Sequence, residues 1–159
     1  MLESDIQPSY LARRRRGTRP QTTPTNPHTQ LTENAPRELQ ERVFEFAASL
    51  PSVVTGPSGV SVPGARAFHL PESSNPSREA FMVGREFAHI HPSHDGSLHM
   101  TLPPEIVDAV IANGWGEMHP LAGKYGAPPN IVMVYGPRDD DELEVVEDLL
   151  RASHALASA

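Results

Sequence analysis

Histidines alternate with apolar residues in the centre of this chain, and that pattern constrains the local fold more than any other feature. His89 and His91 are two residues apart, so on a β-strand they share one face, while Ala88 and Ile90 share the other. Residues 92–96, Pro-Ser-His-Asp-Gly, are turn formers that end in Asp-Gly. We therefore expect a β-hairpin with one chemical face and one core face.

A second strand is expected at residues 97–102. In a symmetric hairpin His91 lies opposite Ser97 and His89 lies opposite His99, with Cβ atoms about 5 Å apart. Leu98, Met100 and Leu102 then join the apolar face. A slip of one residue would bury the histidines and expose the leucines, so the hydrophobic pattern itself favours this register. Residues 85–123 hold five of the eight histidines of the chain, which makes this region the place to look for function.

Composition excludes several classes of protein. The chain has 159 residues, enough for one domain with a core, and it has no cysteine, so a disulfide scaffold, a thiolate zinc site and a cysteine nucleophile are excluded. The formal charge of −7 argues against a nucleic-acid partner. No apolar run reaches the roughly 18 residues of a membrane span, and no signal peptide is visible. A soluble, cytoplasmic protein without a membrane span is therefore expected.

Residues 1–34 differ from the rest. They contain four consecutive arginines, Arg13 to Arg16, several prolines and threonines, and almost no apolar periodicity. Such a segment buries too little apolar surface to offset the entropy of ordering it, so we predict a disordered tail. The arginine run is read as solvated charge, and a binding or targeting patch is the less favoured alternative.

Residues 35–159 are expected to form the folded domain. The predicted elements, in chain order, are a helix at 35–50, strands at 65–70 and 80–83, the two hairpin strands, a helix at 103–112, a strand at 131–135 and a helix at 139–157. Residues 114–130 are rich in glycine and proline and are expected to be a loop. This order, α-β-β-β-β-α-β-α, predicts an α+β fold in which helices pack on one face of an antiparallel sheet.

A longer pattern resembles a known family. The motif Arg-Glu-x-Ala-His-x-His at 85–91 is followed by His-Asp-x-x-Leu-His at 94–99, Gly-Trp-Gly-x-x-His-Pro-Leu-Ala-Gly at 114–123 and Tyr-x-Pro-Arg at 135–138, with Val-Val-Glu at 145–147. Over about residues 65–155 this is similar to the fungal luciferase family. The chain departs from the family pattern at Gly96, where the family has cysteine, and in its polar Arg-rich beginning, where fungal luciferases have a membrane-spanning segment.

The resemblance implies an activity. Fungal luciferases oxidise 3-hydroxyhispidin, a 3-hydroxy-2-pyranone, with molecular oxygen, and a high-energy peroxide then loses carbon dioxide to give an opened pyruvic acid derivative. It therefore implies an oxidoreductase with a small pyranone substrate, molecular oxygen as co-substrate and no organic cofactor. Emission of light is a further expectation.

Oxygenation of an enol without a redox cofactor requires the enolate, and therefore a base with a pKa near the working pH, a stabiliser for anionic oxygens and a dry pocket. Trp115 and Tyr125 are candidate walls, and Asp95 and Glu86 are candidate substrate-binding residues. The candidate catalytic residues are His89, His91, His99, His119 and Arg85.

Three interpretations of the set His89, His91 and His99 remain open at this point. The histidines could act in catalysis without a metal, they could bind a divalent metal that Asp95, Glu86 or His119 completes, or they could form a structural cluster. Two other functions compete with oxygenation: a lactone hydrolase, and a binding module that holds a metal or small ligand without turnover. His28, His69 and His154 receive no functional assignment.

Overall fold

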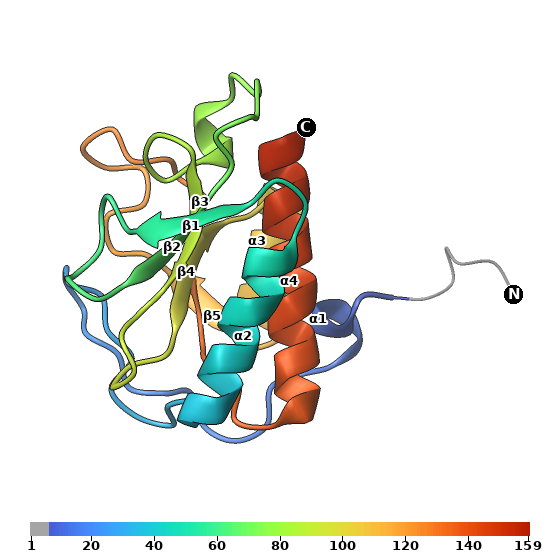
Figure 1. Ribbon diagram of the computed structural model, residues 1–159. Helices are drawn as coiled ribbons and strands as arrows, with labels where there is room; N and C mark the ends of the chain where they lie inside the picture. The colour runs from blue at the N-terminus through green and yellow to red at the C-terminus, as the bar shows by residue number, and fades with distance from the viewer. Residues whose placement is uncertain (1–6) are drawn as a thin grey trace, which may run out of the picture.

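A six-stranded antiparallel sheet is the centre of the molecule, which we describe from a computed structural model for residues 7–159 (Figure 1). The spatial order of its strands is β1-β2-β3-β4-β6-β5, and every neighbouring pair is antiparallel. The strands are β1 (Val54–Pro57), β2 (Arg66–His69), β3 (Glu86–Ile90), β4 (Leu98–Thr101), β5 (Gly116–Met118) and β6 (Ile131–Val134).

Helices cover one face of this sheet, as Figure 1 shows for the long pair α2 and α4, which lie side by side. They are α1 (Ser9–Ala12), α2 (Arg37–Ser49), α3 (Pro104–Ala112) and α4 (Asp140–Ser158), with a short 3-10 helix η2 (Arg78–Ala80). The longest of them, α4, begins where the side chain of Asp139 accepts a hydrogen bond from the backbone of Glu142 at 2.9 Å, an N-cap that the acidic start of the segment predicts. The α+β class is therefore confirmed.

Three local expectations were wrong. Residues 80–83 do not form a strand of the sheet: η2 occupies 78–80, and Gly84 at φ 53° then turns the chain back into β3. Two further strands were not expected. Glycine and proline within β1 obscure its strand pattern, and β5 is three residues long inside the stretch interpreted as loop. Short strands of this kind are stabilised by their neighbours more than by their own sequence.

The two faces of the sheet have opposite chemistry. On one face Ala88 pairs with Met100, and Met100 with Val132, in a row of buried residues that belongs to the hydrophobic core under the helices. On the other face His89 pairs with His99, and His99 with Met133. Because side chains alternate along each strand, the register that buries the apolar row also gathers the histidines on the opposite face.

The prediction of a disordered segment is wrong for residues 7–34, which pack along the domain; residues 1–6 lie outside the described part. Tyr10 belongs to the hydrophobic core, and Gln30 is 1% exposed. Gln30 accepts a hydrogen bond from the backbone of Gly136 and donates one to the carbonyl of Thr32. Polar contacts of this kind hold the segment in place. A prediction based on apolar periodicity could therefore not show that the segment is ordered.

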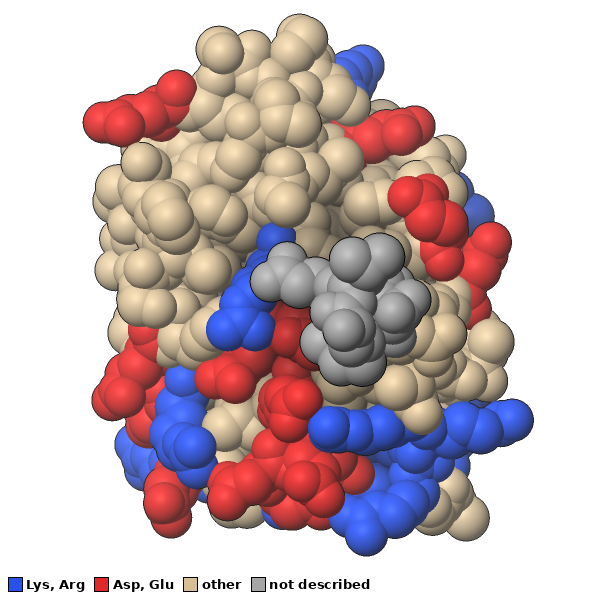
Figure 2. All heavy atoms as spheres, turned by 90° about the vertical axis from the view of Figure 1, so that its right-hand side faces the viewer, with Lys and Arg blue, Asp and Glu red and all other residues tan. Residues whose placement is uncertain are grey.

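The arginine run takes part in this packing. Arg13 pairs with Glu144 and Arg16 with Asp139, at 3.2 and 2.7 Å. Figure 2, which faces the side of α1 and α4, shows basic and acidic side chains next to one another in its lower half. Exposed ion pairs contribute at most about 1 kcal/mol each to the free energy of unfolding, so these contacts add little to the stability of the segment. None of the helices in residues 7–159 is long and apolar enough to cross a membrane.

We expect the packed segment to matter for stability. Truncating the chain so that it begins at Thr32 should lower the free energy of unfolding by at least about 3 kcal/mol, because buried polar groups lose their partners, and the Tm should fall by about 6–12 °C. Thermal unfolding of the truncated and full chains measures this. Within the full chain, Tyr10→Ala should destabilise and Leu31→Ala, at a side chain 55% exposed, should not. An unchanged Tm on truncation would restore the disordered-tail interpretation.

Candidate functional site

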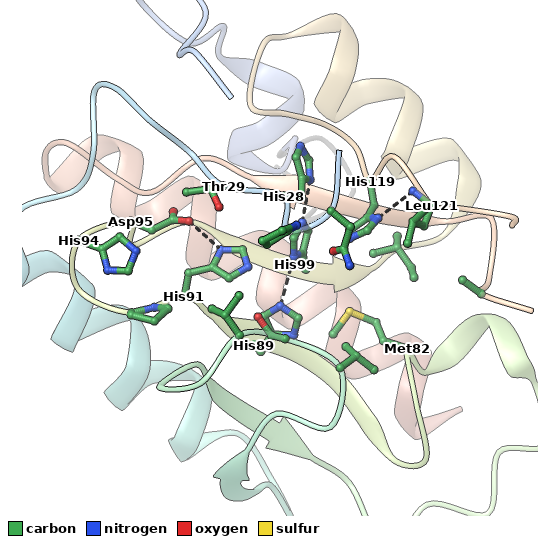
Figure 3. Close-up of a pocket in the computed structure, with 18 residues that line it drawn as sticks. His28, Thr29, Met82, His89, His91, His94, Asp95, His99, His119 and Leu121 are labelled. Carbon is green, nitrogen blue, oxygen red and sulfur yellow. Dashed lines mark hydrogen bonds and ion pairs between the residues drawn. The ribbon is translucent and has the colours of Figure 1, made fainter. Parts of the chain in front are cut away.

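A cavity of about 520 Å³ lies over the histidine face of the sheet (Figure 3). Residues of the N-terminal segment, of the loop at 60–62 and of the region 119–131 surround it. Six of the chain's eight histidines line it: His28, His89, His91, His94, His99 and His119. A volume of this size is typical of pockets that bind small organic ligands.

The hairpin of β3 and β4 supplies the floor of the cavity, in the predicted register. His89 pairs directly with His99, and the backbone of His91 donates to the carbonyl of Ser97 at 2.9 Å. Gly96 adopts φ 76°, a left-handed conformation that a glycine accepts without strain, and so closes the turn. The predicted convergence of His89, His91 and His99 on one face is confirmed, while their roles stay predictions.

Glu86 orients His89. Its carboxylate, fully buried, lies 2.8 Å from Nδ1 of His89 and accepts hydrogen bonds from the hydroxyl of Ser58 and the backbone of Gly59. Burial would raise the pKa of Glu86, but the hydrogen bonds from His89 and Gly59 outweigh it, and the pKa lies below its ordinary value. The carboxylate is therefore ionised, and Nδ1 of His89 is the donor. Glu86 contacts this ring and not the cavity itself.

Asp95 and Ser97 orient His91 in a similar way. The Ser97 hydroxyl donates to Asp95 at 2.6 Å, so its oxygen accepts the 2.9 Å hydrogen bond from Nδ1 of His91. Burial raises the pKa of Asp95, and its bonds from Ser97 and Gln30 oppose that rise. Burial, followed by the charges of the neighbouring histidines, holds the pKa of His91 well below its ordinary value. His91 is therefore neutral, with Nε2 unprotonated.

His99 is linked to a residue that sequence reasoning missed. Its Nε2 lies 2.9 Å from Nδ1 of His28, and Nε2 of His28 lies 2.9 Å from the carboxylate of Glu117. Burial, and then the neighbouring histidines, hold the pKa of His99 well below its usual range. No signal in the sequence singled out His28, because its segment lacks strand or helix periodicity and its partners are 71 and 89 residues away.

Glu117, a residue of β5, is the carboxylate at the end of this row of hydrogen-bonded rings, His99 and His28. It also accepts hydrogen bonds from Arg19 at 2.9 Å and from the hydroxyls of Thr22 and Tyr135. Burial opposes ionisation, but these donors outweigh it and lower the pKa of Glu117 to about 2. Burial and the same carboxylate raise the pKa of Tyr135 to about 12. Gly116 permits this placement, because a Cβ there would lie 2.2 Å from the Met133 carbonyl oxygen of β6.

His119 stands apart from the other rings in its hydrogen bonding. Its Nδ1 accepts the backbone N–H of Leu121 at 2.9 Å, which Figure 3 marks with a dashed line. Burial, followed by the charges of His28 and His89, lowers the pKa of His119 to about 4. His119 is therefore neutral at physiological pH and carries its proton on Nε2, so it can only donate from that nitrogen.

Three predicted site residues lie elsewhere. Arg85 donates to the carbonyl of Asn75 at 2.8 Å and stacks on Phe81, so it does not line the cavity. Trp115 is 6% exposed, belongs to the core, and its indole N–H donates to the carbonyl of Arg13. Tyr125 is 93% exposed, away from the cavity. The apolar side chains that do line the cavity are Val60, Val62, Met82, Leu121, Ala127 and Ile131.

Two groups of three histidines among the described residues could hold a metal ion, each with one nitrogen per ring within 4.8 Å of the others. One is the predicted set of His89, His91 and His99. The other consists of His28, His99 and His119. Asp95 lies 3.5 Å from Nδ1 of His91, on the side away from Nε2, and Glu86 is occupied by His89. Neither carboxylate is thus positioned to complete a metal site, contrary to one of the expectations above.

The hydrogen bonds of Glu117 give a pH-dependent prediction. Glu117→Gln should lower the free energy of unfolding at pH 7 by about 1–3 kcal/mol, because the charge-assisted bonds are lost. The folded pKa of about 2 lies below the ordinary 4.5, so the ionised form stabilises the fold above about pH 4.5, and this contribution is lost as the pH falls toward 2. Urea unfolding of both proteins at pH 3–7 should show the difference shrinking with acid, and a constant difference would contradict the assignment.

Comparisons with known proteins support the family that the motifs suggested. Residues 84–153 match the family model of the luciferase domain. Luciferases of Armillaria ostoyae and Armillaria gallica are 45% and 44% identical to the chain over 71 residues, and that of Neonothopanus nambi is 42% identical. Each alignment covers 43% of this chain, and the chain spans about 27% of the length of these relatives. No solved structure matches. Residues 84–153, which hold the histidine hairpin, Glu117 and His119, are therefore similar to the luciferase domain family.

Proposed function

We propose that this chain is a luciferase-like oxygenase that uses molecular oxygen to oxidise a 3-hydroxy-2-pyranone, with ring opening and loss of carbon dioxide. The observation that carries the proposal is a cavity lined by oriented histidines, four of which, His89, His91, His99 and His119, lie in the segment similar to fungal luciferases. The volume of about 520 Å³ suits a two-ring organic substrate.

Formation of the enolate is the first chemical requirement. In the neutral form of each ring the proton is on Nδ1, from which His89 donates to Glu86 and His91 to Ser97, and Nε2 has a free lone pair. Either nitrogen can accept the proton of an enol, and Glu86 stabilises the imidazolium that would form on His89. The electron-rich enolate can then pass an electron to oxygen, which the neutral enol does too slowly.

Stabilisation of negative charge is the second requirement. The Nε2–H of His119 is held in the donor tautomer by the backbone of Leu121, and its ring borders the cavity. A fixed neutral donor of this kind can hydrogen-bond the anionic oxygen of the enolate or of the peroxide without a change in its own protonation. His119 thus takes the role first expected of Arg85, whose guanidinium donates to the carbonyl of Asn75.

The remaining wall of the cavity is suited to a flat, apolar ring. Met82, Leu121 and Ile131 provide apolar surface there, in the role first expected of Trp115 and Tyr125. Apolar walls exclude water, which strengthens every hydrogen bond to the anion and protects a peroxide from hydrolysis.

The test is an oxygen-electrode assay of the purified chain with 3-hydroxyhispidin, combined with analysis of products and of emitted light. We expect oxygen uptake, release of carbon dioxide and a pyruvic acid derivative. Ring opening without oxygen uptake would show a lactone hydrolase instead. Binding without turnover, with or without added divalent metals, would refute the oxygenase and favour a binding module.

A further inference from the structure

The hydrogen bonds around the hairpin histidines fix which nitrogen of each ring is protonated. Nδ1 of His89 faces the ionised carboxylate of Glu86 at 2.8 Å, so it must carry the proton. Nδ1 of His91 faces the oxygen of Ser97, whose own hydrogen is given to Asp95. In both rings Nδ1 is engaged as a donor on the outside of the cluster, and Nε2 is the nitrogen left to bind a metal.

The third ring, His99, is oriented in a similar way, but through His28 and Glu117 instead of one direct acceptor. Nε2 of His28 lies 2.9 Å from the carboxylate of Glu117 and donates to it, so Nδ1 of His28 is the nitrogen left to accept a hydrogen bond. It lies 2.9 Å from Nε2 of His99 and accepts its proton. Nδ1 of His99 is then unprotonated as well.

Three ring nitrogens therefore meet on the inside of the cluster. Nε2 of His89 and Nδ1 of His99 lie 3.2 Å apart, and one nitrogen of each of the rings of His89, His91 and His99 lies within 4.8 Å of the others. A shared proton or a metal ion would hold the first two nitrogens at this distance, and the convergence of the third ring favours the ion. We propose that His89 Nε2, His91 Nε2 and His99 Nδ1 together bind one divalent first-row transition metal ion, with a further coordination position open to the cavity.

The spacing of His89 and His99 agrees with such an ion. Two imidazole nitrogens 3.2 Å apart, each about 2.0–2.1 Å from a metal, subtend an angle of about 100° at it, between the octahedral and tetrahedral values. Three neutral imidazoles select Zn²⁺, Fe²⁺, Cu²⁺, Co²⁺ or Ni²⁺ over Mg²⁺ and Ca²⁺, which prefer oxygen. Each ring also has the outer acceptor that metal-binding histidines use to fix their orientation.

The second histidine group does not meet the same conditions. His119 would have to offer Nε2 as a lone pair, but its Nδ1 already accepts the Leu121 N–H and leaves the proton on Nε2. His28 is in the relay that orients His99, between that ring and Glu117. The site is therefore assigned to the hairpin, and His28 and Glu117 become positioning residues for it.

Metal binding does not depend on the proposed oxygenation. The metal could serve the enolate as a Lewis acid in place of a free histidine base. It could equally serve another reaction or none. A measurement of binding alone therefore tests the inference, and its failure is distinguishable from a failure of turnover.

The experiment starts with the full chain, produced without a histidine tag, stripped by chelation and titrated with Co²⁺. We expect one Co²⁺ per chain and a visible d–d absorption band typical of nitrogen ligation, with Zn²⁺ displacing it. Elemental analysis of protein that has not been stripped identifies the resident ion. A wild-type chain that binds no Co²⁺ or Zn²⁺ specifically would overturn the inference and would indicate that a shared proton joins His89 and His99.

Variants locate the site. His91→Ala should weaken Co²⁺ binding by more than about 100-fold, and Glu86→Gln, which leaves all three ligands in place, should weaken it by about 10–100-fold. His119→Ala is the matched control, a cavity histidine expected to leave affinity and the absorption band unchanged. Circular dichroism confirms the fold of each. Loss of binding in His119→Ala with retention in His91→Ala would place the metal in the other group and refute the assignment.

Discussion

His91→Ala is expected to lower the rate of oxygen-dependent turnover of a 3-hydroxy-2-pyranone by about 10²–10⁴-fold, the range for loss of a general base, and by more if the ring also binds a metal. His91 lies on the cavity face of the hairpin and contributes nothing to the apolar row under the helices. The fold should therefore persist, and the loss should appear as a decrease in kcat. Oxygen uptake at saturating substrate measures it.

His69→Ala provides the comparison for this variant. His69 lies in β2, outside the residues that line the cavity, and its ring contacts only the Pro57 carbonyl at 3.3 Å among the hydrogen bonds of the described residues. It should leave turnover unchanged. Equal activity of His91→Ala and the wild type, with both proteins folded, would remove His91 from the mechanism. Equal losses in both variants would point to a general effect of the substitutions on the protein.

The hairpin could be predicted because its information is local. His89, His91 and His99 are separated by short, even spacings, and the alternation with Ala88 and Ile90 permits only one register that buries the apolar side chains. The turn formers at 92–96, which end in Asp-Gly, fix the loop length. Secondary structure that rests on such periodic patterns, including α2, α3 and α4, was predicted for the same reason.

The part of the site that His28 and Glu117 form could not be predicted, because its contacts are polar and join residues that are distant in sequence. His28 reaches His99 across 71 residues, and Glu117 reaches Thr22 across 95. These bonds satisfy buried polar groups one at a time and leave no repeating pattern in the sequence. Composition is a poor guide to such a segment. A low content of apolar residues indicates that little apolar surface can be buried, but it says nothing of the hydrogen bonds that hold residues 7–34.

Arg85 and Trp115 show the opposite error. Both belong to the motif shared with the family, and a charged and an aromatic residue next to histidines suggest a substrate site. Their contacts show that neither side chain lines the cavity. Arg85 precedes β3 and its guanidinium lies over Phe81, while Trp115 precedes β5 and closes the N-terminal segment onto the core. A motif can therefore preserve a fold as well as a reaction, and only the contacts distinguish the two uses.

His119→Phe is expected to lower kcat by about 10²–10³-fold, the usual cost of removing one donor to a developing anion, and to leave metal content unchanged. The Leu121 backbone holds the His119 ring as a neutral donor, and its low pKa of about 4 keeps it in that form across the physiological range. His119→Gln still offers an N–H and should recover part of the rate, which a purely structural role would not predict. The measurement is kcat and KM from oxygen uptake, with metal analysis of each protein. If Phe and Gln at this position lower kcat equally, His119 shapes the cavity and does not donate to the anion. If the Phe variant also loses its metal, the ring is a ligand, and the proton assigned to its Nε2 is wrong.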